Sequence, residues 1–464
     1  MIFSSAIFVF GFLPAFLGVY YAVPSHWRTG VILLGSSVFY AWWRLDYLLL
    51  VYGVSIASWL AASAAYRARD IRSRKCAVMI GVSFDLAVLG YFKYTMFFMN
   101  GFNELVQTFG GGVISVPSII LPIGISFLIF QCISYIIDVA RRDAEPASNL
   151  LDFMAFSTLF PQLIAGPVLR YKDVAQQLVS RRHTTVKFSA GMARFVQGLA
   201  MKLLIADSVA PLADRIFALP DPTAAEAWLG ALAYSVQLLF DFAGYSAMAI
   251  GLGLMLGFRF VENFDAPYTS RSITEFWRRW HISLSLWLRD YLYVPLGGNR
   301  KGPLRTYINL MATMVLGGLW HGANWTFLAW EAWHGAWLAA ERLMGAKGGS
   351  PWPAPVAWPI TMVLVIFGWV LFRAETLGQA VNMWAAMAGV HGWAITAAVN
   401  WQIQPTEVLA LIVGGLLSLF AQQASKAVRD VPQSIRVSAT SAAFVAACAI
   451  LIEQSHSPFL YFQF

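Results

Sequence analysis

"QLLFDFAGYSAMAIG", residues 237–251, is an apolar stretch that carries one charged side chain, Asp241. It lies inside a longer apolar segment, residues 226–257, and that segment exceeds the roughly 20 residues that a helix needs to cross a bilayer. The pattern predicts a membrane-spanning helix. Asp241 is a candidate functional residue, because a charge in mid-membrane costs at least about 2.5–3.5 kcal/mol.

The composition of the whole chain extends this prediction. Of its 464 residues 58% are hydrophobic and only 12% are charged, about half the charge of a typical soluble domain. We therefore predict an all-α polytopic integral membrane protein with about ten to twelve transmembrane helices, in a single domain over residues 1–464. The other expected spans are 6–23, 30–43, 47–66, 76–94, 113–140, 189–217, 305–345 as a pair, 355–373, 405–422 and 437–453.

The formal net charge is +8, and the basic residues sit in short loops between the expected spans. The loop "RARDIRSRK", Arg67–Lys75, and the loop that holds Arg28 are predicted to be cytoplasmic under the positive-inside rule. The N-terminus is then external, and we expect a lipid bilayer rather than nucleic acid as the partner of these charges. The three cysteines, Cys76, Cys132 and Cys448, have no metal or redox spacing.

Two segments depart from the pattern of simple spans. "FMAFSTLFPQLIAGPVLRY", residues 153–171, is apolar but interrupted by Pro161, Gly166 and Pro167, which predicts a broken, re-entrant segment. "SITEFWRRWHISLSLWLRDYLYVPLGGNRKG", residues 272–302, has helical periodicity with a polar stripe. We predict that Ser272 or Thr274 caps this amphipathic helix, which lies in the interface or lines a polar cavity. The stripe contains Arg278, His281, Ser285 and Arg289.

His321 is the strongest catalytic candidate from the residues alone. In "GGLWHGANWTF", residues 317–327, glycines allow close backbone approach, Trp320 and Trp325 are rigid walls, and Asn324 is a nearby polar group. A neutral imidazole in such a pocket can act as a general base on a hydroxyl. His334 and Glu331 form a possible polar pair, for which a structural role is favoured.

The remaining histidines lie in expected loops or terminal segments, namely His26, His183, His391 and His456. The chain has no GxSxG elbow, no HExxH motif, no P-loop and no cluster with metal-ligand spacing, so no metal site is expected.

Several long motifs resemble the membrane-bound O-acyltransferase family. "FWRRWHISLSLWLRDYLYVPLGGNRKG" followed by "LGGLWHGANWTFLAWEAWHG" is similar to the paired signature of this family. Other stretches are similar to the branch that acetylates bacterial exopolysaccharides such as alginate, and they occur in order along nearly the whole chain. They are "MIFSS", "SSVFYAWWRLDYL", "LGYFKY", "LPIGISF", "SYIIDV", "LIAGPVLRY", "GFRFVENFDAPY" and "PFLYFQF".

The resemblance implies a fold with re-entrant or interfacial helices around a central tunnel, and a signature core at about residues 226–345. It implies that His321 is the essential residue near the middle of the tunnel and that His281 lies on its cytoplasmic side. The implied donor substrate is acetyl-CoA, with no bound cofactor. The implied partners are a periplasmic protein that resembles an SGNH hydrolase and an exopolysaccharide acceptor, at the bacterial inner membrane. Further candidates for the tunnel are Asp241, Asn324, Trp320, Trp277 and Arg170.

A polyanionic donor such as CoA requires a basic mouth on the cytoplasmic side. The candidates for contact with its phosphates are Arg278, Arg279, Arg289, Arg300 and Lys301, some of which could instead meet lipid phosphates. Water exclusion from the tunnel would protect the thioester from hydrolysis.

The acceptor is the more open question. Relatives in this family commonly have "GYSDMAIG" where this chain has "GYSAMAIG", so Ala247 replaces an aspartate. Alginate is the expected polymer, and cellulose, a lipid or a small molecule remain alternatives. A transporter or export subunit is a hypothesis from another class, but it predicts repeats or a series of intramembrane carboxylates that the sequence lacks. A purely structural scaffold would not explain the polar stripe with His281.

Overall fold

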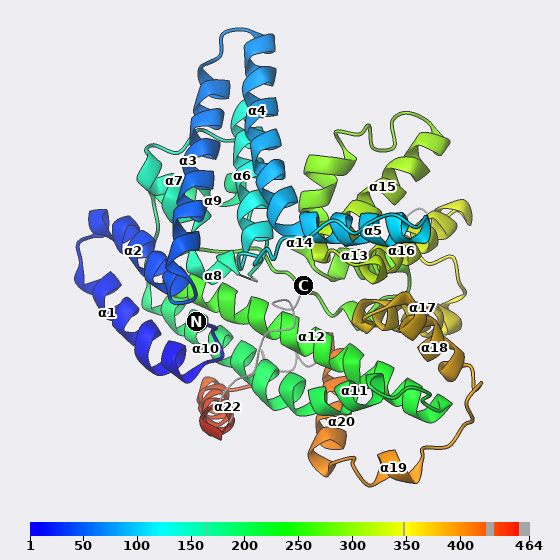
Figure 1. Ribbon diagram of the computed structural model, residues 1–464. Coiled ribbons are helices and arrows are strands. Elements are labelled where there is room, and N and C mark those ends of the chain that lie inside the picture. The colour runs from blue at the N-terminus through cyan, green and yellow to red at the C-terminus, as the bar shows by residue number, and fades with distance from the viewer. Residues whose placement is uncertain (165, 347–348, 424–430, 454–464) are drawn as a thin grey trace. The chain divides into compact units, whose positions relative to one another are not determined.

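The computed structural model describes residues 1–164, 166–346, 349–423 and 431–453. Within these ranges the regular structure is entirely helical, and no residue lies in a β-strand (Figure 1). The predicted all-α class is confirmed. Helices suit an apolar chain because they satisfy every backbone hydrogen bond within one segment, as a bilayer requires. The motif "PFLYFQF" and His456 lie outside the described residues.

Six helical segments in the described ranges are long and apolar enough to cross a membrane, so this is a multi-pass membrane protein. They are Leu45–Arg67, Ile71–Thr108, Thr185–Phe217, Ala224–Met255, Ala354–Arg373 and Gln433–Ile452, and two shorter apolar segments are Ile7–Ala22 and Pro405–Leu419. This number is below the expected ten to twelve, because several expected spans form helices that are shorter or less apolar. These are α2 (Arg28–Ala41), α6 (Ile125–Arg141), α15 (Pro303–His321) and α16 (Trp325–Leu343).

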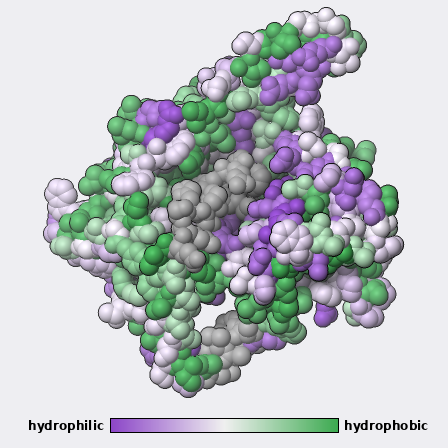
Figure 2. All heavy atoms as spheres, turned by 60° about the horizontal axis from the view of Figure 1, so that its bottom comes forward, coloured by the Kyte–Doolittle hydropathy of each residue, from purple (hydrophilic) through white to green (hydrophobic). Residues whose placement is uncertain are grey.

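The surface carries many large apolar side chains, as the green areas of Figure 2 show. On α3 (Leu45–Arg67) Leu49 is 74% exposed, and on α4 (Ile71–Leu89) Ile80 is 66% exposed. Apolar patches of this kind are uncommon on soluble monomers. In this protein they belong to segments that the length and hydropathy assign to the bilayer.

The chain forms two compact units, and the first consists of Met1–Gly191 with Ala249–Val261. In it α3, α4 and α6 pack side by side, where a Cβ on Gly81 of α4 would lie 2.6 Å from the Ala61 Cβ. The absence of that side chain lets the helices approach. The other elements are η1 (Ile7–Phe12), α1 (Leu13–Ala22), η2 (Ser25–Trp27), α2, η3 (Gly90–Tyr94), α5 (Thr95–Thr108), α7 (Leu150–Ser157), α8 (Phe160–Leu163), α9 (Tyr171–Val179) and the first part of α10 (Thr185–Ala200).

One sequence prediction for this unit is confirmed, and another is wrong in part. The apolar stretch 153–171 is broken as predicted, since α7 ends at Ser157 and α8 begins at Phe160 with Pro161 in its first turn. The expected span 113–140 is wrong in its first part, because residues 113–122 have no regular structure and α6 begins only at Ile125.

The second unit consists of Met192–Met248 with Glu262–Phe464. Its helices α15 and α16 form a closely packed pair (Figure 1). The elements are the end of α10, η4 (Met201–Ala206), α11 (Asp207–Phe217), α12 (Ala224–Met255, whose last turns belong to the first unit), η5 (Pro267–Thr269), α13 (Ile273–Arg279), α14 (Ile282–Leu288), η6 (Arg289–Tyr293), α15, α16, α17 (Ala354–Arg373), α18 (Leu377–Met387), α19 (Ala397–Asn400), α20 (Pro405–Leu419) and α22 (Gln433–Glu453).

The single amphipathic helix predicted over residues 272–302 is wrong. The chain leaves the helix at Trp280 and turns at His281, whose φ of +44° is left-handed. The preceding loop enters this break, because Asp265 N–H donates to Arg279 O at 3.0 Å and Ile282 N–H donates to Asn263 O at 3.0 Å. These bonds replace helical ones, so the polar stripe does not exist. The predicted cap is confirmed, since the Ser272 side chain accepts from Glu275 N–H at 3.0 Å.

Candidate active site

The site begins with the pair α15 and α16, which glycines bring together. A Cβ on Gly318 would lie 2.6 Å from Phe327 O and 3.1 Å from the Glu331 Cβ. A Cβ on Gly317 would lie 3.4 Å from Glu331 Oε1. A side chain at Gly318 would collide with the α16 backbone, so this glycine allows α16 to place Glu331 beside the end of α15.

His321 ends α15 and is buried. Its Nε2 atom lies 4.0 Å from Glu331 Oε1. The ring lies 5.0 Å from both the Trp320 and Trp330 rings, each in edge-to-face geometry. The Glu331 carboxyl group thus lies beside the imidazole within an aromatic enclosure, beyond direct hydrogen-bond distance.

His281 is the second imidazole, and its ring centre lies 6.2 Å from that of His321. Its Nδ1 is 3.1 Å from Asn263 Oδ1, which also accepts from Ser283 N–H at 3.2 Å and Ser283 Oγ at 2.8 Å. Because Asn263 presents its carbonyl oxygen, the His281 Nδ1 carries the proton and Nε2 has a free lone pair.

The protonation state of His281 follows from its surroundings. It lies between two seven-residue helices that are too short to span a membrane, and no part of it is exposed. Burial lowers the pKa of His281 to about 3. The ring is therefore neutral at physiological pH, with its Nε2 available as an acceptor.

Glu341 of α16 fixes the N-terminus of α13, the helix that precedes His281. Its carboxylate accepts from Ile273 N–H at 2.5 Å and from Thr274 N–H at 2.9 Å. It also accepts from the Thr274 hydroxyl at 2.7 Å. A carboxylate at a helix N-terminus satisfies free amides and complements the helix dipole, so α13 is tied to α16 at one end and carries His281 just past its other end.

Many buried polar atoms around the two histidines have no hydrogen-bond partner among the described residues. Native proteins leave few such atoms, and a group of them indicates bound water or a ligand. Because their side chains contact one another in a connected set, these atoms point to a polar binding site inside the second unit. They are the Nε1 atoms of Trp277, Trp280, Trp330 and Trp369, His281 Nε2, Glu331 Oε2, Asn263 Nδ2 and both ring nitrogens of His334.

Some sequence candidates lie within this cluster. Trp320 is buried, with its ring 6.0 Å from that of His281. Trp277 packs edge-to-face against His334 at 5.4 Å. The possible pair of His334 and Glu331 is not formed, because Glu331 approaches His321 while His334 lies among aromatic rings.

Two other candidates are engaged elsewhere in the second unit. Asn324 caps α16, where its Oδ1 accepts from Thr326 N–H at 3.2 Å and its Nδ2 donates to Glu375 O at 3.0 Å. Asp241 is buried and its Oδ1 lies 2.7 Å from the Nζ of Lys202, which also lies 2.7 Å from Asp207 Oδ1. A tunnel role for either residue stays a prediction.

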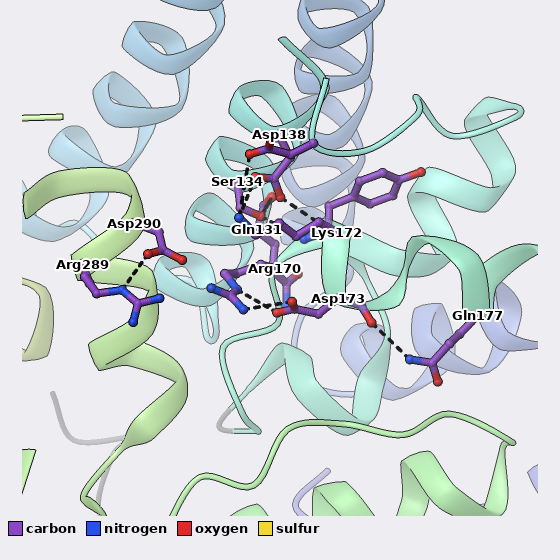
Figure 3. Close-up of polar contacts among 11 residues, drawn as sticks. Gln131, Ser134, Asp138, Arg170, Lys172, Asp173, Gln177, Arg289 and Asp290 are labelled. Atoms are coloured by element: carbon purple, nitrogen blue, oxygen red, sulfur yellow. Dashed lines mark hydrogen bonds and ion pairs between the residues drawn. The ribbon is translucent and has the colours of Figure 1, made fainter. Parts of the chain in front are cut away.

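The predicted phosphate contacts differ in their present partners. Arg279 pairs with Glu275 at 2.8 Å, and Arg289 pairs with Asp290 at 2.7 Å. Arg278, Arg300 and Lys301 are exposed. Arg170 belongs to the first unit, where it pairs with Asp173 through two bonds of 2.7 and 2.9 Å (Figure 3). No group of three His, Cys, Asp or Glu side chains in the described part of the chain could hold a metal ion.

The sequence matches the model of the membrane-bound O-acyltransferase family over residues 124–374, a range that contains His281, His321 and Glu331. The chain belongs to this family. The protein is therefore an O-acyltransferase, and the transporter hypothesis is no longer needed. The buried imidazole pair lies within the part of this membrane-bound O-acyltransferase that the family shares.

Similar proteins extend the match to the whole chain. The probable alginate O-acetylase AlgI of Pseudomonas putida is 48% identical, with both chains fully covered. The probable alginate O-acetylase AlgI of Pseudomonas aeruginosa is 52% identical over 90% of this chain and 81% of its own. The peptidoglycan O-acetyltransferase of Helicobacter pylori is 34% identical over 84% of this chain and 80% of its own.

Sequence reasoning missed three residues of this membrane-bound O-acyltransferase site: Glu331 as a neighbour of His321, Asn263 and Glu341. Glu331 and Glu341 carried a usable signal, because each is a carboxylate in the apolar segment 305–345. Asn263 carried none, since it lies in a loop and reaches His281 only through the fold.

Proposed function

We propose that this protein transfers the acetyl group of cytoplasmic acetyl-CoA across the bacterial inner membrane for the O-acetylation of alginate. Two observations support the proposal. The AlgI relative of Pseudomonas putida is 48% identical over the whole chain, and that of Pseudomonas aeruginosa is 52% identical over 90% of it. In the described structure two buried histidines lie close together among polar atoms that have no hydrogen-bond partner there. Of the two observations, this arrangement is the main support for the proposal.

In the proposed reaction His321 is the general base. It takes the proton of an acceptor hydroxyl while the hydroxyl oxygen attacks the thioester carbonyl. A C–O bond forms, the C–S bond breaks, and the CoA thiolate leaves and takes up a proton. Glu331 orients the imidazole, and its carboxyl oxygen accepts a hydrogen bond from the imidazolium N–H that forms.

His281 has a different proposed role. The His281 Nδ1–H donates to Asn263 Oδ1, so Nε2 is the ring nitrogen that remains for contact with a substrate. A neutral ring of this kind can accept a hydrogen bond from the substrate but cannot donate one. We assign it to positioning the donor on the cytoplasmic side, with Arg278, Arg279, Arg289, Arg300 and Lys301 as the proposed contacts for the phosphates of CoA.

The acceptor hydroxyl is proposed to belong to a periplasmic partner that resembles an SGNH hydrolase and completes the transfer to the polymer. The Trp-rich enclosure of Trp280, Trp330 and Trp369 supports water exclusion around the thioester. The peptidoglycan O-acetyltransferase relative makes peptidoglycan a second candidate acceptor, at lower identity.

The test uses the full chain in proteoliposomes. Acetyl-CoA labelled in the acetyl group is added to the solution on the side that the cytoplasmic face of the protein contacts. Label should pass to the partner protein and then to mannuronate-rich polymer. His321→Ala should abolish transfer, while His391→Ala, a loop histidine bonded to Pro222 O, should leave it unchanged. Unaltered transfer by His321→Ala would refute the assignment. Transfer to muropeptides but not to alginate would favour the second acceptor.

A further inference from the structure

A second group of charged and aromatic side chains lies in the first unit, around His183. The end of α1, the turn before α2, the loop after α9 and the residues after α12 meet at His183. The Tyr20 hydroxyl donates to Leu256 O at 3.0 Å, so its oxygen accepts from His183 Nε2–H at 2.9 Å. His183 Nδ1 therefore accepts from Arg28 at 3.1 Å.

Three cations surround this histidine and are bonded to neutral acceptors. Arg28 donates to the imidazole, and Arg181 donates to Thr29 Oγ1 at 3.2 Å and Leu178 O at 3.1 Å. Lys187 donates to Gly257 O at 3.3 Å. Among the described residues no carboxylate pairs with any of the three within 4.0 Å. Among the described residues, none of the three cations therefore has a directly paired carboxylate.

The carboxyl group of Asp152 on α7 interacts with the charge of Arg181 without pairing with it directly. Burial raises the pKa of Asp152, and the charge of Arg181 lowers it. Burial and then the charges of Arg28 and Arg181 lower the pKa of His183. The imidazole therefore stays neutral, and the surplus of positive charge rests on the two guanidinium groups and the ammonium group.

The two arginines are also held in place without an anion. The Arg28 guanidinium lies 5.4 Å from the Tyr20 ring centre, and that of Arg181 lies 4.8 Å from the Phe258 ring centre. The Nε atoms of Arg28 and Arg181 are buried and have no hydrogen-bond partner in the described structure. Each fork thus retains donors that an anion could satisfy.

The surroundings match the boundary of a bilayer. Trp27, Val179 and Val186 are large exposed side chains of the same region, and all three are more than 60% exposed. Apolar and Trp side chains beside arginines are typical of the headgroup layer. We propose that Arg28, Arg181 and Lys187 form a binding site for a phosphoryl group, which the headgroup of an anionic phospholipid supplies. Planar guanidinium groups suit phosphate oxygens.

The test uses the delipidated full chain in a neutral detergent, with the probe phosphatidylglycerol and the phosphate-free lipid diacylglycerol as comparison. Native mass spectrometry measures the bound lipid, and the thermal unfolding midpoint measures its effect. The wild type should retain phosphatidylglycerol and unfold at a higher temperature with it. Arg28→Gln with Arg181→Gln should weaken this binding at least about tenfold.

Arg44→Gln is the matched control, because Arg44 already pairs with Asp46 and lies beyond the other end of α2. It should bind phosphatidylglycerol as the wild type does. Lys187→Gln is a milder variant should the double variant fail to fold, with an expected loss of about threefold. Wild-type affinity for phosphatidylglycerol in Lys187→Gln and in the double variant Arg28→Gln with Arg181→Gln would overturn the site. Equal stabilisation of the wild type by diacylglycerol would do the same.

A second arm separates the two sources of phosphate. Adenosine 3′,5′-bisphosphate is added in solution in place of the lipid. Binding of this nucleotide but not of phosphatidylglycerol, with loss of that binding in the double variant, would keep the phosphoryl site and overturn its assignment to lipid.

Discussion

The ring centres of His281 and His321 lie 6.2 Å apart, and a left-handed turn at the first residue and close-packed glycines before the second create this relationship. Neither feature belongs to a regular amphipathic helix. The imidazole pair therefore depends on backbone geometry as much as on the two side chains.

Glu331→Gln tests the carboxylate beside His321. The variant keeps the shape of the side chain but cannot ionise, so an imidazolium that forms at His321 loses the carboxyl group that could stabilise it. We expect kcat to fall about 10²-fold with little change in KM. Steady-state acetyl transfer over a range of pH checks this, since a merely structural role would not shift the pH profile. Glu145→Gln, which changes a carboxylate of the first unit bonded to Tyr66, is the control and should retain activity.

The pH dependence of stability tests the environment of His281. Burial lowers the pKa of His281 in the folded protein to about 3, against about 6.5 in the unfolded chain. The unfolded chain therefore binds the proton first, and this stability is complete above pH 6.5 and is lost as pH falls toward 3. The unfolding midpoint of the wild type should fall more steeply over this range than that of His281→Gln. Parallel curves for the two proteins would contradict the buried, neutral state.

Gly318→Ala tests the close approach of α15 and α16. The new Cβ would press on Phe327 O and the Glu331 Cβ, so the helices must separate. We expect a loss of about 1–3 kcal/mol in the free energy of unfolding together with lower activity. Thermal unfolding and acetyl transfer measure the two effects. Gly53→Ala on α3, where a Cβ would meet nothing within 4 Å, should leave both nearly unchanged.

Lys202→Met tests the buried ion pairs in the second unit. Lys202 lies 2.7 Å from carboxylate oxygens of both Asp207 and Asp241, and its removal leaves these anions without their cation. We expect a loss of about 3–5 kcal/mol in the free energy of unfolding, partly restored by Asp241→Leu in the same chain. A small effect of Lys202→Met, measured by thermal unfolding in detergent, would show that the pairs contribute little.

The prediction of the fold was most accurate where a local rule decides the structure. Ser272 caps α13 because serine is a preferred N-cap residue, whose hydroxyl accepts from an amide of the first helical turn. The proline-interrupted stretch at 153–171 breaks for the same local reason. Periodicity failed over residues 272–302, because the loop at Asn263–Asp265 contributes hydrogen bonds that interrupt the helix, and a periodic pattern contains no information about that loop.

The amino-acid sequence alone was sufficient to predict an all-helical membrane protein with His281 and His321 as its catalytic candidates. The length of apolar segments, the order of motifs and the residue types can be determined without knowledge of contacts between distant parts of the chain. Three relationships come from tertiary packing: Glu331 lies 4.0 Å from His321, Asn263 accepts from the His281 Nδ1–H, and Asp241 pairs with Lys202. These contacts join residues from different helices and loops, so they depend on how closely the helices pack, which the spacing of residues along one helix does not specify.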